Sequence, residues 1–287
     1  MKKISLFSIT KILFACFFLM DTAADGALMI NALRCEYQTN PLAVDTTIPR
    51  LGWGLDSPQR NQEQSAYQVL VASEERRLQD DTGDLWDSGK IQSSQSIQVP
   101  YGGKELVSFQ RCYWKVRVWD RNDRPSPWSE VATWSMGILQ EKDWNAQWIT
   151  AGETTSSLPI FRREFFVEKP IRSARVFICG LGFYELRLNG EKVGDLVFDP
   201  GWTNYRKTCL YSTYDITQQL KHDRNALGVM LGNGMYNVSG GRYVKFTGTF
   251  GEPKLILRLH IEYADGSVSE LVSDPSWKWV AGPIVFS

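Results

Sequence analysis

The chain has 287 residues, of which 43% are hydrophobic, 22% charged and 13% aromatic, a composition typical of a globular protein that buries sizeable cores. Lys plus Arg and Asp plus Glu both number 32, so the formal net charge is zero. This balance argues against a nucleic-acid or polyanion partner. The 11 Trp, 11 Tyr and 14 Phe have two interpretations, because aromatic rings fill sandwich cores and also stack on sugar rings.

The first 24 residues are predicted to be a signal peptide. Two lysines precede an apolar stretch at residues 12–20, and small residues allow cleavage after Ala24. This stretch is well short of the roughly 20 residues that span a bilayer, so we expect export to the periplasm or the extracellular space and no transmembrane segment. Cys16 offers the alternative of a lipoprotein anchor, although the bulky Phe14 fits such a motif poorly.

Cleavage after Ala24 would leave four cysteines: Cys35, Cys112, Cys179 and Cys209. An oxidising compartment allows disulfides, and four cysteines permit three pairings. Pairing Cys35 with Cys112 and Cys179 with Cys209 would keep each bridge within one domain. The alternative is four buried free thiols, since Cys is among the most buried residue types. The cysteines have no Cys-x-x-Cys spacing and no nearby His, so we predict no metal and no cofactor.

Residues 27–140 are predicted to form an antiparallel β-sandwich. Six strand-like runs recur with turn signals between them, at residues 30–37, 50–55, 67–73, 96–101, 112–120 and 130–136. In the clearest run, Trp114, Val116 and Val118 are expected to face the core, while Lys115 and Arg117 face water. A short helix is expected at residues 74–78. No polar side chains converge in this domain, so we interpret it as a spacer or docking platform.

Residues 144–287 are predicted to form a second antiparallel sandwich after a boundary between residues 137 and 147. Asn189-Gly190 and Asp265-Gly266 are residues of tight hairpin turns, and a helical turn is expected at residues 217–221. Residues 161–167 do not alternate cleanly between apolar and charged, which predicts burial on both faces. A last strand is expected at residues 277–286, and because the chain stops there we expect this sandwich to be incomplete at its carboxyl end.

Four motifs follow one another in the second domain. They read CGLGFYELRLNG at residues 179–190, DPGWTNY at 199–205, YSTYDIT at 211–217 and LGNGMY at 231–236. Each motif alone is weak, because Asn-Gly hairpins are common. In this order and spacing, they resemble the amino-terminal sandwich of bacterial α-L-rhamnosidases.

The resemblance implies an all-β fold of two consecutive sandwiches, the first fibronectin type III-like and the second jelly-roll-like. The first is supported by the strand at residues 113–119 and by Trp128-Ser129, which resemble the corresponding parts of a fibronectin type III module. In the resembled family a further sandwich, a helical (α/α) barrel that carries the acid and base glutamates, and a carboxy-terminal sandwich follow. The chain therefore resembles a rhamnosidase truncated before its catalytic barrel.

The loops of the motif region supply the candidate sugar contacts: Trp202, Tyr205, Asn233, Tyr236 and Arg242. Amides and guanidinium groups hydrogen-bond vicinal hydroxyls, and aromatic faces cover the apolar face of a pyranose. The alternative is that Trp202 and Tyr236 fasten loops onto the sandwich or onto the absent barrel.

No catalytic residue is predicted. Glycoside hydrolysis requires two positioned carboxyl groups. Glu185 in a strand, Asp199 in a turn and Asp215 before a helical turn each fit an ordinary structural role. The histidines, His222 and His260, accompany no nucleophile motif.

Two hypotheses for function remain. In the first, the chain is the accessory part of a secreted α-L-rhamnosidase, which as a whole removes terminal α-L-rhamnose with inversion. Its partners would be rhamnose-containing glycans and the catalytic barrel of the same protein. In the second, it is a free-standing exported carbohydrate-binding or adhesion module without catalysis.

Overall fold

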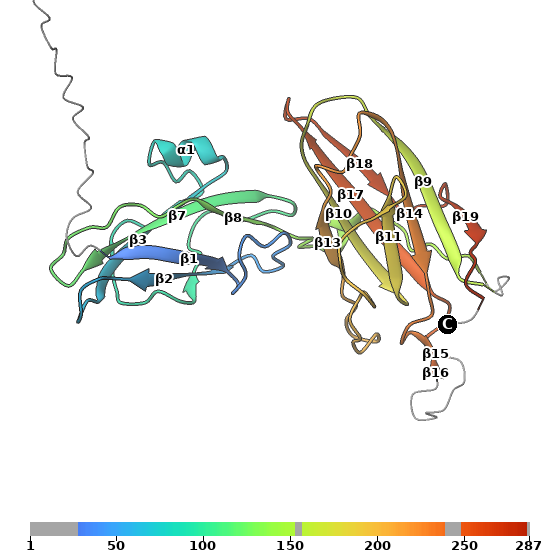
Figure 1. Cartoon of the computed structure of the whole chain (residues 1–287), viewed down its shortest axis with the longest axis horizontal. Coiled ribbons are helices and arrows are strands. Elements are labelled where there is room, and N and C mark those ends of the chain that lie inside the picture. Colours follow the sequence, from blue (N-terminus) through green and yellow to red (C-terminus); the bar gives the residue numbers. More distant parts are fainter. Residues whose placement is uncertain (1–27, 153–156, 239–247, 286–287) are drawn as a thin grey trace, which may run out of the picture.

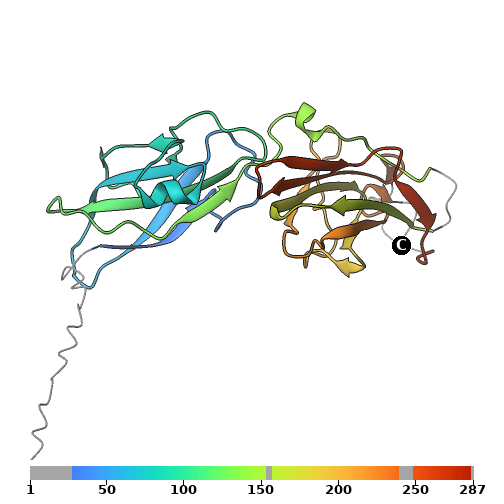
Figure 2. The ribbon, with the colours of Figure 1, turned by 90° about the horizontal axis from the view of Figure 1, so that it is seen from above.

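The computed structural model describes residues 28–152, 157–238 and 248–285 (Figure 1). The predicted signal peptide and Cys16 lie outside the described residues. In the described part of the chain, no helix is long and apolar enough to cross a membrane. The chain folds into two β-sandwiches that follow one another along its long axis (Figure 2), which confirms the predicted all-β fold.

The first sandwich pairs a three-stranded sheet with a larger sheet. Its strands are β1 Met29–Cys35, β2 Arg50–Asp56, β3 Gln64–Ala72, β4 Trp86–Asp87, β5 Ile91–Gln92, β6 Val99–Pro100, β7 Arg111–Asp120 and β8 Ala132–Ser135. The small sheet has the order β1-β2-β6 and the larger one β4-β3-β7-β8, with β5 also paired to β3. Neighbouring strands are antiparallel. The predicted strands are therefore confirmed, although only the end of the run at residues 96–101 is paired.

The core of the first sandwich forms because alternate residues of β7 point inward. Trp114, Val116 and Val118 are fully buried there, as the alternation predicts. The prediction that Lys115 faces water is wrong, because helix α1 (Glu75–Gln79) covers the outer face of β3 and β7. The Lys115 ammonium donates to the Leu78 carbonyl and pairs with the Asp81 carboxylate.

The second sandwich pairs a four-stranded sheet with a five-stranded one. Its strands are β9 Pro159–Val167, β10 Ile171–Leu181, β11 Tyr184–Leu188, β12 Glu191–Lys192, β13 Ser212–Asp215, β14 Asp223–Leu231, β15 Asn237–Val238, β16 Gly248–Thr249, β17 Lys254–Tyr263, β18 Val268–Val272 and β19 Lys278–Ala281. The sheets have the orders β13-β10-β17-β18 and β12-β11-β14-β9-β19, while β15 and β16 form a separate pair.

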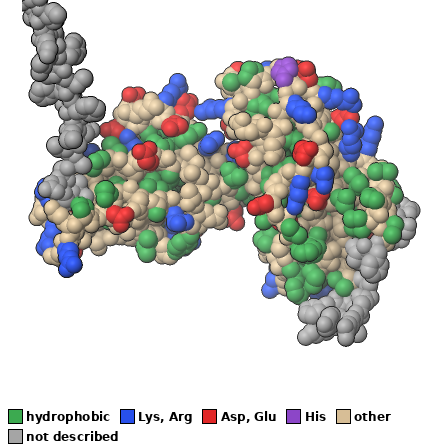
Figure 3. Space-filling model, viewed as in Figure 1, with side chains coloured by type: hydrophobic (Ala, Val, Ile, Leu, Met, Phe, Trp, Pro, Cys, Tyr) green, Lys and Arg blue, Asp and Glu red, His purple; other side chains and the backbone are tan. Residues whose placement is uncertain are grey.

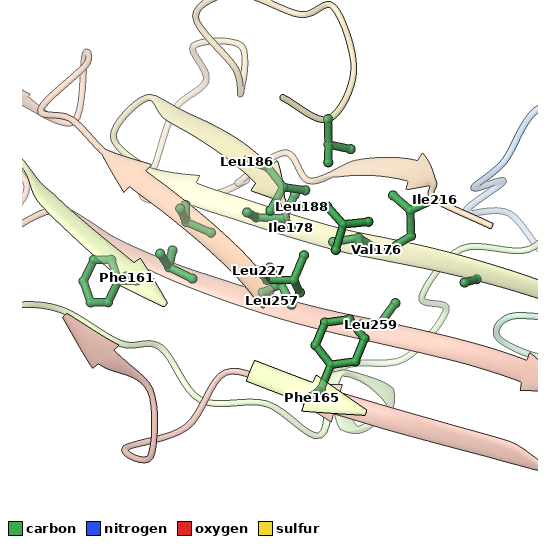
Figure 4. Close-up of a cluster of buried hydrophobic side chains, with 14 of the residues drawn as sticks. Phe161, Phe165, Val176, Ile178, Leu186, Leu188, Ile216, Leu227, Leu257 and Leu259 are labelled. Carbon is green, nitrogen blue, oxygen red and sulfur yellow. The ribbon is translucent and has the colours of Figure 1, made fainter. Parts of the chain in front are cut away.

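One hydrophobic core lies between these two sheets. The side chains labelled in Figure 4 come from both sheets and from the turn after β13: Phe161, Phe165, Val176, Ile178, Leu186, Leu188, Ile216, Leu227, Leu257 and Leu259. Residues 161–167 were predicted to be buried on both faces, and this is wrong. Phe161, Phe165 and Val167 point into the core, whereas Phe166, between Phe165 and Val167, is exposed, as in an ordinary strand with one solvated face.

The turns lie where the sequence predicts them. Asn189 and Gly190 have φ of 53° and 92°, and Gly266 has φ of 82°, so both predicted hairpins are confirmed. The turn predicted at residues 217–221 is present as a single turn, in which the Leu220 amide donates to the Ile216 carbonyl at 3.2 Å, and it does not extend into a helix. Asp215 still accepts a hydrogen bond from the Thr217 amide at 2.9 Å. A short 3₁₀ helix, η1 (Glu141–Trp144), was not predicted.

Phe109 of the first sandwich contacts the outer face of the four-stranded sheet in the second. Its ring stacks on His260 with centroids 4.8 Å apart and meets Phe177 edge-on at 5.2 Å. The Arg258 guanidinium lies 4.6 Å from the centre of the same ring, and Arg175 donates to the Phe109 carbonyl. Since cations and rings attract most where water is excluded, this cluster joins the two sandwiches.

Arg258 also holds the segment between the sandwiches. It is only 5% exposed, and it donates to the carbonyl oxygens of Asp143 and Trp144 at 2.7 and 2.9 Å. The same guanidinium pairs with the Glu270 carboxylate. The segment around η1 is therefore bound to the second sandwich through backbone carbonyls.

The four described cysteines are free thiols, and Cys209 is exposed while the other three are buried. The expectation of four buried thiols is therefore wrong for Cys209, which lies on the loop between β12 and β13. Burial raises the pKa of Cys35 and of Cys179 to about 12, so both remain protonated at neutral pH.

Of the four described cysteines, we expect a maleimide to label only Cys209 in the native protein. The other three thiols should react only after denaturation, because the thiolate is the nucleophile and these groups are both buried and protonated. Mass spectrometry of the labelled protein measures this result. Rapid native labelling of Cys112 would contradict the burial, and denatured protein that reacts only after reduction would show a disulfide.

Candidate functional site

The candidate site lies on loops at one end of the second sandwich. The loop between β12 and β13, the turn between β10 and β11, and the turn after β14 gather there, close to the β15–β16 pair (Figure 1). The motifs of the sequence supply these loops, since glycines and Asn-Gly pairs permit the sharp reversals.

A cleft of roughly 260 Å³ opens between these loops, and we call it the rim cleft. Phe183, Phe198 and Asn233 line it, together with Glu185 and Lys192. The two rings lie 5.4 Å apart between centroids, and Phe198 is 72% exposed. The cleft therefore combines open aromatic faces with an amide and charged groups, the combination that binds a sugar ring.

Phe198 has an unusual backbone conformation. Its φ is 59°, in the left-handed region that bulky side chains rarely adopt. Such residues persist only where neighbouring contacts hold them, and they cluster at functional sites. The next residue, Asp199, provides those contacts.

Asp199 is a buried carboxylate that fixes the loop from within. Its Oδ1 accepts a hydrogen bond from the Ser212 hydroxyl at 2.8 Å. Its Oδ2 accepts from the Tyr214 hydroxyl at 2.9 Å and from the Tyr184 hydroxyl. Burial, with the nearby Asp199 adding to it, raises the pKa of Tyr214 to about 12 and that of Tyr184 further. The sequence interpretation of Asp199 as a turn residue missed this burial.

The structure brings Tyr205 and Tyr236 together. Their rings meet edge-on with centroids 5.3 Å apart, and both also contact the ring of Phe250, which sequence reasoning missed. Tyr236 is only 6% exposed, and its hydroxyl donates to the Phe250 carbonyl at 3.1 Å. These contacts are those of a residue that fastens two loops together.

The other predicted sugar-contacting residues are Trp202, Asn233 and Arg242. Trp202 is 59% exposed on the loop between β12 and β13, and Asn233 lines the rim cleft, where its Oδ1 accepts from the Asn237 amide at 3.1 Å. Arg242 lies outside the described residues. Phe183 and Phe198 were not predicted, although the apolar run Leu-Val-Phe after a Gly-Asp turn was a signal for Phe198.

Exposed apolar side chains gather on the same loop. Leu196, Val197 and Phe198 are all more than half exposed there. Figure 3 shows hydrophobic side chains gathered at the lower end of the second sandwich. Exposed apolar patches on a soluble protein mark surfaces that bind ligands or partners. The loop between β12 and β13 is therefore a candidate surface for binding a ligand or another part of the protein.

The carboxylates that the sequence raised as catalytic candidates have structural partners. Glu185 accepts from the Arg187 guanidinium at 2.7 Å, Asp215 from the Thr217 amide, and Asp199 from three hydroxyls. Within the described ranges, no three His, Cys, Asp or Glu residues are grouped so that they could hold a metal ion.

These features define a tandem of two β-sandwich modules, an immunoglobulin-like one followed by one whose loops enclose a cleft. Residues 30–140 match the Rha78A-like, N-terminal immunoglobulin domain, and residues 169–287 match the α-L-rhamnosidase N-terminal domain. The chain therefore corresponds to the amino-terminal part of α-L-rhamnosidases, as the motifs predicted. Immunoglobulin and fibronectin type III domains share the sandwich architecture, so the first match agrees with the predicted fold.

Individual relatives agree. An α-L-rhamnosidase of Formosa agariphila is 39% identical to this chain, and the match covers 93% of this chain and 31% of the relative. An α-L-rhamnosidase of Alteromonas sp. is 36% identical, and the match covers 86% of this chain and 28% of the relative. The solved α-L-rhamnosidase of Dictyoglumus thermophilum is 43% identical with a TM-score of 0.80, over 88% of this chain and 30% of that one. The solved α-L-rhamnosidase of Aspergillus terreus is 32% identical with a TM-score of 0.75, and the match covers 90% of this chain and 30% of that one. The chain thus spans less than a third of these relatives.

Proposed function

We propose that this chain serves as the non-catalytic, sugar-contacting amino-terminal part of an exported α-L-rhamnosidase. The observation that carries the proposal is its match to relatives named α-L-rhamnosidase over no more than 31% of their length. The whole protein would remove terminal α-L-rhamnose from rhamnosides with inversion, as the sequence resemblance implies. The basic and apolar leader at residues 1–24 supports export.

The rim cleft supports the sugar-contacting role. Phe198 and Phe183 present rings that can cover the apolar face of a pyranose, and Asn233 and Lys192 lie within the same cleft to bind hydroxyls. The cleft volume of roughly 260 Å³ is just below the range of about 300–1,000 Å³ for small-molecule sites, so the cleft is large enough for no more than a single sugar ring. Such a site would hold the substrate near the enzyme without reacting with it.

We expect the purified chain to show no turnover of an aryl α-L-rhamnoside. Hydrolysis needs two carboxyl groups about 5–9.5 Å apart across the scissile bond. A rim that binds ground state and transition state equally gives no acceleration. The assay compares release of the aryl alcohol by this chain with release by a full-length relative of the same family.

The control variant in that assay is Asp199→Asn, which removes the buried charge of the rim. If the chain hydrolyses the rhamnoside and the Asp199→Asn variant does not, the active site lies in these two sandwiches and the proposal is overturned. Turnover by the relative alone supports it.

A further inference from the structure

A second and larger cleft lies between the segment around η1 and the second sandwich, and we call it the junction cleft. Its volume is roughly 810 Å³, and it runs beside η1 and the outer face of β10 and β17. Trp144, Trp148 and Tyr211 supply aromatic surface, and Asn145 and Gln147 supply amides. The site was not predictable from the sequence, because strand pairing brings residues 141–148 against Cys179 and Ile256, which are distant in the chain.

The aromatic wall of the junction cleft is held in place by specific contacts. Trp144 meets Tyr211 edge-on with centroids 5.5 Å apart, and the Tyr211 hydroxyl accepts a hydrogen bond from the Ile138 amide at 3.1 Å. The Gln147 carbonyl accepts from the Ser273 hydroxyl at 2.6 Å. Preorganised walls of this kind reduce the entropy that is lost on binding.

Trp148 is the residue in this wall that offers its ring to solvent. It is 42% exposed, and it follows Gln147, whose backbone is bonded to Ser273 on both its amide and its carbonyl. An exposed ring on a fixed backbone is a stacking platform at low entropic cost.

The polar groups around the ring carry both signs of charge. Lys142 and Lys207 lie in the cleft with Glu141, so no single sign dominates. Hydroxyl groups accept from ammonium and amide N–H groups and donate to carboxylates, so such a mixture suits a polyhydroxylated ligand better than an ion. A volume of roughly 810 Å³ lies high in the range of about 300–1,000 Å³ for small-molecule sites.

We propose that the junction cleft binds a short oligosaccharide, with one pyranose ring stacked on Trp148. This inference rests on the proposed sugar-contacting function and extends it, because the rim cleft suits one ring and the junction cleft suits several. The loop between β12 and β13 contributes to both clefts, with Phe198 in the rim cleft and Lys207 in the junction cleft. The two clefts together would hold a glycan chain against the second sandwich.

The test is calorimetric titration of the whole chain with two probes, L-rhamnose and a trisaccharide of α-linked L-rhamnose. Wild-type protein should bind the trisaccharide more tightly than the monosaccharide. Trp148→Ala should weaken trisaccharide binding about tenfold and leave the L-rhamnose affinity unchanged. Phe198→Ala should weaken binding of L-rhamnose.

The matched control is Trp279→Ala, since Trp279 is 43% exposed but lies on β19, away from the junction cleft. It should leave both affinities unchanged. Unchanged trisaccharide affinity in Trp148→Ala would overturn the proposal that the junction cleft binds sugar, and it would leave the proposal for the rim cleft unaffected. Failure of wild-type protein to bind either probe would instead overturn the proposed sugar contact itself.

A second measurement needs no variant. Cys209 lines the junction cleft and is exposed, so bound trisaccharide should slow its labelling by a maleimide. L-Rhamnose at a concentration that saturates the rim cleft should not slow it. Equal labelling rates with and without saturating trisaccharide would overturn the proposed position of the ligand.

Discussion

Replacing Arg258 by Met is expected to lower the free energy of unfolding by about 2–3 kcal/mol, because it removes a buried guanidinium from several acceptors at once. The Glu270 carboxylate would lose its partner, and the carbonyls of Asp143 and Trp144 would lose their donor. The Phe109 ring would also lose the cation that lies 4.6 Å from its centre. Met retains the apolar stem, so the loss comes from the polar contacts.

Urea unfolding followed by fluorescence measures this change. The control is Arg224→Met, because the Arg224 side chain is 65% exposed where it pairs with Glu164, and exposed pairs contribute about 0–1 kcal/mol. Both variants remove a guanidinium from a Glu partner, but only Arg258 is buried and also donates to backbone carbonyls. Similar losses in both variants would show that Arg258 does not join the sandwiches.

The strands were predictable because their signal is local. Alternation along residues 112–120 placed Trp114 and Val116 correctly, and the Asn189-Gly190 and Asp265-Gly266 pairs fixed two hairpins. Lys115 was misplaced because its environment is set by α1, a helix that lies more than 30 residues earlier in the chain. Periodicity shows which side of a strand a residue occupies, but not what covers that side.

The candidate site was predictable as a set of loops but not as a set of contacts. The motifs placed Tyr205 and Tyr236 on loops, and the structure adds Phe250 from β16's end as their common partner. The Asp199 carboxylate is buried only because β11 and β13 bring Tyr184 and Tyr214 to it. Pairing of strands distant in sequence decides such contacts, and it leaves no periodic signal in the chain.

The buried Asp199 carboxylate is expected to contribute to stability. Asp199→Ala is expected to lower the free energy of unfolding by about 3 kcal/mol, since buried hydroxyls that lose their acceptor cost about 1–3 kcal/mol each. Tyr184 is buried and Tyr214 half-buried, and both donate to the same carboxylate oxygen. Asp199→Asn should cost less, because its amide oxygen still accepts from the hydroxyls.

Asp199→Ala should also free the loop that carries Phe198 to change its conformation. Phe198 keeps its left-handed backbone only while its neighbour is anchored, so Asp199→Ala should also weaken L-rhamnose binding in the titration. The control is Asp195→Ala, an exposed carboxylate on the same loop, which should change neither stability nor affinity by more than about 0.5 kcal/mol. If Asp199→Ala lost stability but bound L-rhamnose with wild-type affinity, the anchor would serve the fold alone. Loss of both, with Asp195→Ala unaffected, is the result expected of a carboxylate that positions a binding loop.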